Sequence, residues 1–261
     1  MQASCLHHYL VLIIVLSKNT YTQVLTRFSL KKIPMQTDIF KELFPLFDAA
    51  NVETLEWLLA EAVERDYPAG RAVLMEDAWG NAVYFILSGW VKVRFVRSQD
   101  TTTLAVLAQG DFFGEMAILD ESPRSTDVVA FTPVRVLMVH AQKFIQLLFK
   151  DPQLHHRMLQ LMVGRLRKTN QRTQLRQQVP AVRVASILMG LGDAYGNKTD
   201  AGVEIFNLPV SDIADLSEVN PEDTNKVLEK LKEKGWIVID SKRQVMTITN
   251  EKQMVQLATF R

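Results

Sequence analysis

Cysteine is almost absent from this chain of 261 residues, because Cys5 is the only one. A single cysteine cannot form an internal disulfide, a four-cysteine zinc site or a cysteine-ligated iron–sulfur cluster. The five histidines do not cluster with carboxylates at the spacing of a metal site. The sequence therefore predicts no metal, haem or iron–sulfur cluster, and a reducing compartment such as the cytoplasm.

Long hydrophobic runs and enzyme motifs are also missing. The apolar run at residues 9–16 is eight residues long, whereas a membrane-spanning helix needs about 20. The sequence shows no Ser-His-Asp arrangement, no P-loop and no metal-ligand spacing. The net charge of +1 says nothing for or against a nucleic-acid partner. These absences predict a protein that neither spans a membrane nor acts as an enzyme.

Acidic residues are absent from the first 34 positions, which contain four basic residues. The flanks of the apolar run do not have the charged n-region and small-residue cleavage site of a secretory signal. We expect residues 1–34 to be a disordered extension that precedes Met35. A weak membrane-surface anchor is the alternative.

The next part of the chain changes from a helical to a strand-like pattern. Apolar residues between Asp38 and Glu64 recur at helical spacing. From Ala72 to Val139, short apolar runs alternate with turns. Strands of this length and spacing are typical of a β-sandwich or β-barrel.

Acidic residues are absent again from residues 152–192. Asp151-Pro152 can begin a helix there. One apolar seam is predicted along this helix, formed by Leu154, Met158, Leu161, Met162, Leu166 and Thr169. Such a seam usually meets a partner helix, so we expect a dimer. Packing of the helix on its own domain is the alternative.

The last third of the chain has the pattern of three short helices followed by two strands. Helices are expected at residues 184–194, at 211–216 with Ser211 as N-cap, and at 221–234 with Asn220 as N-cap. Strands are expected at residues 236–240 and 245–249. This order predicts a winged helix.

The stretch FGEMAILDESPRSTDVVA at residues 113–130 carries a possible ligand site. Arg124 can donate several hydrogen bonds to an anion, and Glu115 can accept one from a hydroxyl group. Gly114 permits close approach of the backbone. These groups suit a small ligand with a hydroxyl at one end and an anion at the other. A salt bridge between Arg124 and Glu115, with no ligand, is the alternative.

This stretch resembles the phosphate-binding cassette of cyclic-nucleotide-binding domains, through Gly-Glu-x-Ala followed by Pro-Arg-Ser-Thr. The order of parts over residues 40–250 is similar to that of the Crp/Fnr (cyclic-AMP receptor protein) family of bacterial transcription regulators. The resemblance implies cyclic AMP as the effector, with cyclic GMP as the alternative. It implies that Arg124 binds the phosphate, Glu115 the ribose, Thr169 the adenine, and Asn170 the adenine of the other subunit. The implied ligand-binding residues are Gly114, Glu115, Met116, Ala117, Arg124, Ser125, Thr126, Arg165, Thr169 and Asn170.

The same resemblance implies that the winged helix binds double-stranded DNA. The implied DNA-binding residues are Ser211, Asn220, Glu222, Asp223, Asn225, Lys226, Lys230, Lys242 and Arg243. Several positions depart from the family pattern: Glu218 replaces the turn glycine, Pro221 an arginine, and Lys226 another arginine. Residues 209–261 hold nine acidic and eight basic residues, which is a poor footprint for phosphate. A helix face that touches no DNA is therefore the alternative.

Together these patterns predict an α+β fold. We expect a cyclic-nucleotide-binding β-roll of the jelly-roll kind at residues 35–150, a dimerisation helix at 151–178 and a winged-helix DNA-binding domain at 179–261. The expected function is that of a homodimeric, cyclic-AMP-responsive transcription regulator in the cytoplasm, with RNA polymerase as a further partner and no membrane partner. The alternative is a cyclic-nucleotide-binding protein whose DNA binding is weak or lost, and which acts through a protein partner.

Overall fold

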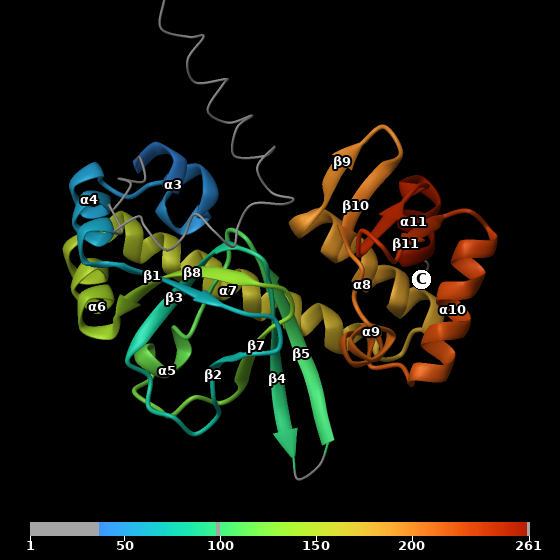
Figure 1. The fold of residues 1–261 in the computed structure, drawn as a ribbon, viewed down its shortest axis with the longest axis horizontal. Helices are drawn as coiled ribbons and strands as arrows, with labels where there is room; N and C mark the ends of the chain where they lie inside the picture. The colour runs from blue at the N-terminus through green and yellow to red at the C-terminus, as the bar shows by residue number, and fades with distance from the viewer. Residues whose placement is uncertain (1–36, 98–99, 260–261) are drawn as a thin grey trace, which may run out of the picture. The chain divides into compact units, whose positions relative to one another are not determined.

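The computed structural model describes residues 37–97 and 100–259, which belong to one compact unit. The extension expected at residues 1–34 lies outside the described residues. The described chain forms a β domain, a long helix and a C-terminal helical domain with its own small sheet (Figure 1). The fold is α+β, as the sequence patterns predict.

The β domain contains two antiparallel four-stranded sheets. The first has the order β1-β8-β3-β6 and the second the order β2-β7-β4-β5. The strands are β1 (Val63–Tyr67), β2 (Ala72–Leu74), β3 (Ala82–Ser88), β4 (Trp90–Arg97), β5 (Asp100–Ala108), β6 (Phe112–Phe113), β7 (Asp127–Ala130) and β8 (Val134–His140). Strand β5 is an edge strand of the second sheet.

Strand β3 is buried on both of its faces, and this explains its nearly continuous apolar sequence. Tyr84 and Ile86 belong to a core cluster that also contains Val91 and Val128 from the second sheet. Phe85 points the other way, because side chains alternate along a strand, and its ring lies 5.5 Å from that of Phe44. The two sheets therefore share one core, and aromatic residues of the flanking helices form another.

The flanking helices are α3 (Thr37–Leu43), the 3-10 helix η1 (Pro45–Phe47), α4 (Val52–Glu61) and α6 (Ala141–Lys150), and the short helix α5 (Met116–Leu119) lies between β6 and β7. The helical pattern expected from Asp38 to Glu64 therefore forms three short helices and not one. Pro45 contributes to the break, because proline lacks the N–H that a helix interior requires. The end of this range was assigned wrongly, since Val63 begins strand β1, which pairs with β8.

The long helix α7 (Pro152–Leu175) begins where the sequence predicts. The Asp151 carboxylate caps it by accepting hydrogen bonds from the backbone N–H groups of Gln153 at 3.0 Å and Leu154 at 3.2 Å. The predicted seam is divided in the structure. Leu154 and Met158 are buried, whereas Leu166 is exposed.

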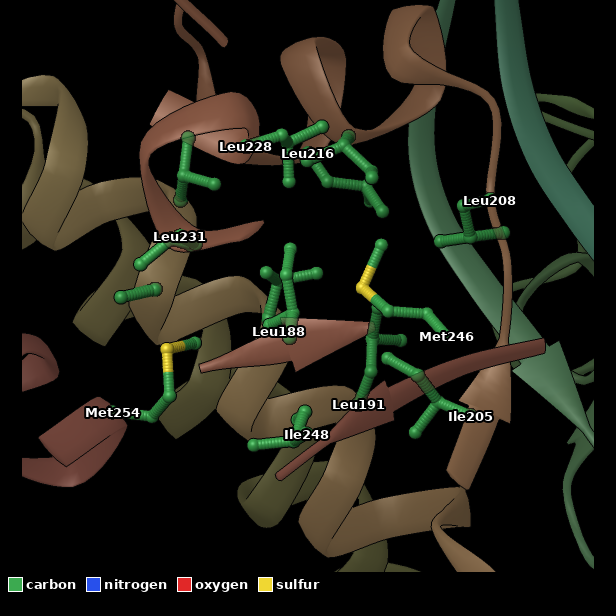
Figure 2. Close-up of a cluster of buried hydrophobic side chains, with 14 of the residues drawn as sticks. Leu188, Leu191, Ile205, Leu208, Leu216, Leu228, Leu231, Met246, Ile248 and Met254 are labelled. Carbon is green, nitrogen blue, oxygen red and sulfur yellow. The ribbon is translucent and has the colours of Figure 1, made fainter. Parts of the chain in front are cut away.

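The C-terminal domain packs helices around a small sheet with the order β11-β12-β10-β9. Its elements are α8 (Pro180–Tyr195), β9 (Asn197–Thr199), β10 (Gly202–Phe206), α9 (Val210–Ser217), α10 (Pro221–Glu233), β11 (Ile237–Asp240), β12 (Val245–Ile248) and α11 (Glu251–Ala258). Figure 2 shows the core, in which Leu188, Leu216 and Leu228 come from three helices and Met246 and Ile248 from β12.

The domain has three features that the sequence patterns did not predict: the hairpin β9–β10, helix α11 and the early start of α8 at Pro180. The N-cap assigned to Ser211 is also wrong. Helix α9 begins at Val210, and Pro209 occupies the N-cap position without a side-chain hydrogen bond. The N-cap predicted at Asn220 is confirmed, because its side chain accepts from the N–H of Asp223 at 2.8 Å.

Candidate functional site

The loop that joins β6 to β7 holds Arg124 in an almost buried position, with 5% of its surface exposed. Its guanidinium donates hydrogen bonds to the backbone carbonyls of Gly114 and, at 2.8 Å, of Ala82. Its backbone N–H donates to the carbonyl of Ala78 at 2.9 Å and its backbone carbonyl accepts from the N–H of Asp77 at 2.9 Å, so the backbone of Arg124 is held on both sides. Arg124 is therefore oriented by the protein before any ligand binds.

Two glycines make room for this guanidinium. A Cβ atom at Gly80 would lie 3.2 Å from Cζ of Arg124, and one at Gly114 would lie 2.9 Å from its Nη1. Gly114 also has a positive φ of 86°, which a residue with a side chain rarely adopts. The role of Gly114 agrees with the motif, whereas Gly80 was not identified because it lies in a separate loop.

Burial lowers the pKa of the Arg124 guanidinium from its usual value, while the nearby Tyr84 and Glu115 side chains oppose this shift. Arginine nevertheless stays charged at neutral pH. Two of its five N–H donors bind the carbonyls of Gly114 and Ala82, and the other three have no hydrogen-bond partner among the residues that the structure describes.

Glu115 is also almost buried, with 2% of its surface exposed. Its Oε1 accepts from Arg165 of helix α7, and Arg165 also donates to the carbonyl of Phe112 at 2.7 Å. The guanidinium carbon of Arg165 lies 4.4 Å from the centre of the Phe112 ring. The ion pair of Glu115 is thus made with Arg165 and not with Arg124, so the salt bridge considered as the alternative is wrong.

The remaining predicted ligand residues lie on the cassette loop and on helix α7. Ala117 is buried, Thr126 is half-buried, and Met116 and Ser125 are exposed. Thr169 and Asn170 lie exposed on α7, one turn beyond Arg165, and the Thr169 hydroxyl donates back to the carbonyl of Arg165 at 3.1 Å. The structure brings Gly114, Glu115, Arg124 and Arg165 together. Within the described residues, the side chains of Thr169 and Asn170 make no hydrogen bond to the cassette loop.

The second candidate surface is the helix-turn-helix formed by α9 and α10. The turn residue Glu218 has a φ of 52°, where the family pattern has glycine. Its carboxylate accepts from Arg176 at 2.6 Å, and its carbonyl accepts from Arg183 at 2.5 Å. These arginines hold the turn in a conformation that otherwise favours glycine.

The N-cap and the first two turns of α10 carry an exposed polar cluster. Lys226 pairs with Glu222 at 2.8 Å and with Asp223 at 3.3 Å, and the Asn220 amide donates to Asp223 at 2.8 Å. The hydrogen bond from Asn220 and the one from Lys226 lower the pKa of Asp223. The cluster presents carboxylates, an amide and an ammonium group, which are all groups that read base edges.

The other predicted DNA-binding residues come from α9, from α10 and from the turn between β11 and β12. Ser211, Asn225, Lys230 and Lys242 are exposed. Arg243 of the β11–β12 hairpin is exposed as well, but its guanidinium pairs with Glu204 at 3.1 Å. A phosphate contact by Arg243 therefore competes with this ion pair.

Within the described residues, no helix is long and apolar enough to cross a membrane. The same part of the chain contains no group of three or more His, Cys, Asp or Glu side chains that could hold a metal ion.

Comparison with known proteins identifies a domain family for the β domain and another for the C-terminal domain. Residues 64–151 match the family model of the cyclic nucleotide-binding domain, and residues 182–257 match that of the Crp-like helix-turn-helix domain. The chain is 27% identical over 201 residues to the "CRP-like cAMP-activated global transcriptional regulator" of Mycobacterium tuberculosis, covering 76% of this chain and 89% of that one. It is 28% identical over 202 residues to the "Cyclic AMP receptor protein" of Thermus thermophilus, covering 74% and 88%.

Solved structures share the fold. FixK2 from Bradyrhizobium japonicum superimposes with a TM-score of 0.66 at 20% identity, covering 77% of this chain and 98% of that one. The global regulator CLP of Xanthomonas campestris gives a TM-score of 0.62 at 21% identity, covering 76% and 99%.

A cyclic-nucleotide-binding domain joined by a long helix to a DNA-binding winged helix defines a ligand-responsive transcription regulator, and this class is not enzymatic. The chain belongs to the Crp/Fnr family of transcription regulators.

Proposed function

We propose that the effector is cyclic AMP and that the protein acts as a homodimer in the bacterial cytoplasm. The observation that carries this proposal is the pair of almost buried groups, Arg124 and Glu115, at the two ends of the cassette loop. Within the described part of the chain, Arg124 has N–H donors without a partner that can bind an anionic phosphate, and Glu115 has Oε2 as an acceptor for the ribose 2′-hydroxyl. Relatives whose names include cyclic AMP support this choice.

The other ligand contacts follow from the position of α7. Arg165 holds Glu115 and thereby fixes α7 against the cassette. Thr169 and Asn170 lie on the next turn, where the adenine would extend from the ribose. Thr169 contacts the adenine bound in its own subunit, and Asn170 contacts the adenine bound in the partner subunit. Gly114, Met116, Ala117, Ser125 and Thr126 complete the proposed site.

The proposed dimer contact is the exposed apolar stripe of α7, which consists of Leu159, Val163 and Leu166. Each of these side chains is more than half exposed, at 55%, 55% and 61%. Their spacing of four and three residues is that of a coiled-coil seam. A helix with such a stripe is stabilised when a second copy covers it.

The proposed domain limits are residues 35–150 for the ligand domain, 151–178 for the dimer helix and 179–261 for the DNA-binding domain. We assign base contacts to Glu222, Asp223, Asn225 and Lys226. Phosphate or backbone contacts are assigned to Ser211, Asn220, Lys230, Lys242 and Arg243. RNA polymerase stays a predicted partner.

Calorimetric titration tests the effector directly. Cyclic AMP should bind more tightly than cyclic GMP, and 5′-AMP should bind weakly because its open phosphate carries more charge and a different shape. A gel shift with genomic DNA, with and without cyclic AMP, tests the regulator against the alternative that acts through a protein partner. Tight cyclic AMP binding with no ligand-dependent shift would support that alternative.

A further inference from the structure

The edge strand β5 of the ligand domain is packed against the DNA-binding domain. Val106 of β5 belongs to the same buried cluster as Leu188, Leu216 and Leu228. Trp90 of β4 lies 5.5 Å from the ring of Phe206 in β10. The core of the winged helix therefore continues onto the β4–β5 ribbon.

A buried polar contact fixes helix α9 on this ribbon. The Thr103 hydroxyl donates to Oδ1 of Asp212 at 2.6 Å, and Lys92 donates to the same oxygen at 3.0 Å. Thr103 and Asp212 are each only 3% exposed. The N–H of Thr103 also donates to Asp215 at 2.8 Å. Because buried polar groups are costly to leave unpaired, this contact defines where α9 can lie.

The same position of β5 is connected to the cassette loop across two strands. Thr103 is the cross-strand partner of Arg94, and Arg94 is the cross-strand partner of Asp127. The Arg94 guanidinium donates to Oδ2 of Asp127 at 3.0 Å. Asp127 directly follows Thr126, the last residue of the proposed phosphate site, and its other oxygen accepts from the N–H of Glu76 at 2.8 Å.

We propose that Asp127, Arg94, Thr103 and Asp212, here called the cross-strand line, transmit occupancy of the cassette to helix α9 within one subunit. This inference rests on the proposed function, because it needs a ligand that binds the cassette. A ligand that orders the loop at Thr126 changes the position of Asp127, and the paired strands carry this change to Asp212. Strand pairing, the Arg94–Asp127 ion pair and the buried Thr103–Asp212 hydrogen bond connect these residues in sequence. Packed contacts of this kind carry coupling energy when they have two alternative arrangements.

Thr103→Val tests the line with little change of shape, because it removes the hydroxyl and leaves the backbone contact to Asp215. The matched control is Thr101→Val, which makes the same change on the same strand at an exposed position. The measurement is the ratio of DNA dissociation constants without and with cyclic AMP. Allosteric ratios typically lie at about 5–150-fold. Thr103→Val should lower the wild-type ratio at least about fivefold, and Thr101→Val should leave it unchanged.

Cyclic AMP affinity of the free Thr103→Val protein should stay close to that of the wild type, since the line begins after the ligand contacts. Hydrogen exchange of the α9 amides gives a readout that needs no ligand, and Thr103→Val should exchange faster there than Thr101→Val. If Thr103→Val does not fold, Arg94→Gln breaks the line at its middle. A wild-type protein that binds no cyclic AMP would refute the proposed function. A coupling ratio that Thr103→Val or Arg94→Gln leaves intact would refute the line alone.

Discussion

The guanidinium of Arg124 has a structural task as well as its proposed ligand contact. It donates to the carbonyl of Gly114, directly after β6, and to the carbonyl of Ala82, at the start of β3. Removing the whole side chain would remove both hydrogen bonds and would cost about 1–3 kcal/mol. A substitution that keeps a donor therefore separates ligand binding from folding better than alanine does.

Arg124→Gln should bind cyclic AMP at least tenfold more weakly than the wild type. Glutamine can still donate to a backbone carbonyl, but it has no charge for the phosphate, and a charged hydrogen bond contributes about 1.5–3 kcal/mol. Calorimetric titration measures the affinity, and Arg135→Gln is the control because Arg135 is exposed and forms an ion pair with exposed Asp66 at 3.4 Å. Equal affinities of Arg124→Gln and wild type would contradict the phosphate role.

Asp151 should stabilise the protein in a pH-dependent way. Burial favours its neutral acid, but the N–H donors of Asn51, Leu154 and Gln153 prevail and hold the pKa of Asp151 below its usual value. A depressed pKa in the folded state gives stability that is present above the unfolded pKa of about 3.9 and is lost as the pH falls through the folded pKa.

Asp151→Ala should therefore lower the melting temperature near pH 7 by several degrees, since loss of a helix cap costs about 0.5–2 kcal/mol. The difference from the wild type should shrink as the pH falls below about 4. Thermal unfolding over this pH range measures the effect, with Asp66→Ala as an exposed control. A difference that stays constant with pH would exclude the charged cap.

At the level of single residues, local motifs were predictable from the sequence and distant partners were not. The N-cap at Asn220 was predictable because a cap and its helix are neighbours in the chain. The partner of Glu115 was not, because Arg165 lies 50 residues away on another element. Ser211 was assigned as a cap on residue type alone, whereas the helix begins one residue earlier.

At the level of elements, α7 has two apolar faces that its sequence does not distinguish. Leu154 and Met158 are buried and contribute to the ligand domain, and Leu159, Val163 and Leu166 are exposed. The predicted seam combined members of both faces, because helical spacing identifies a face but not what covers it. The hairpin β9–β10 was missed because β9 is short and entirely exposed, and therefore lacks an apolar alternation.

Val163→Glu should convert the proposed dimer into a monomer, because it places a charge in the centre of the exposed stripe. Sedimentation equilibrium measures the change in mass. Gln171→Glu is the matched control, since it adds the same charge to the same helix at an exposed position away from the stripe. A Val163→Glu protein that remains dimeric would place the dimer contact elsewhere.

Lys226→Ala should weaken DNA binding by at least tenfold. It should also lower the slope of log DNA affinity against log salt concentration by about one. Lys226 offsets the carboxylates of Glu222 and Asp223 on the turn of α10 that would face DNA. Its loss removes the positive charge that offsets both carboxylates near phosphates, although the Asn220 amide still donates to Asp223. Lys232→Ala is the control, because Lys232 pairs with Glu229 at 2.9 Å near the other end of the same helix. Equal gel-shift affinities for the two variants would contradict this orientation of α10.

At the level of the whole molecule, α7 contacts both the cassette and the helix-turn-helix. Near the middle of α7, Arg165 donates to Glu115 of the cassette loop. Arg172 donates to the carbonyls of Leu104 at 2.6 Å and Leu216 at 2.8 Å, which joins β5 to α9. A ligand that contacts α7 can therefore bias the position of α9, but only by its differential affinity for the two arrangements.

This coupling must be reciprocal, so cyclic AMP should tighten DNA binding and DNA should tighten cyclic AMP binding by the same factor. Thr169→Ala should reduce that factor more than it reduces cyclic AMP affinity, because the phosphate and ribose contacts remain. Thr173→Ala is the matched control, since its hydroxyl donates to the carbonyl of Thr169 at 3.2 Å just as Thr169 donates to Arg165 one turn earlier. Cyclic AMP affinities of free and DNA-bound protein, measured for the wild type and both variants, decide the matter. Equal cyclic AMP affinities of free and DNA-bound wild type would mean that ligand binding and DNA binding are independent. An equal loss of the coupling factor in both variants would show that helix α7 responds to the loss of any hydroxyl and not to the loss of an adenine contact.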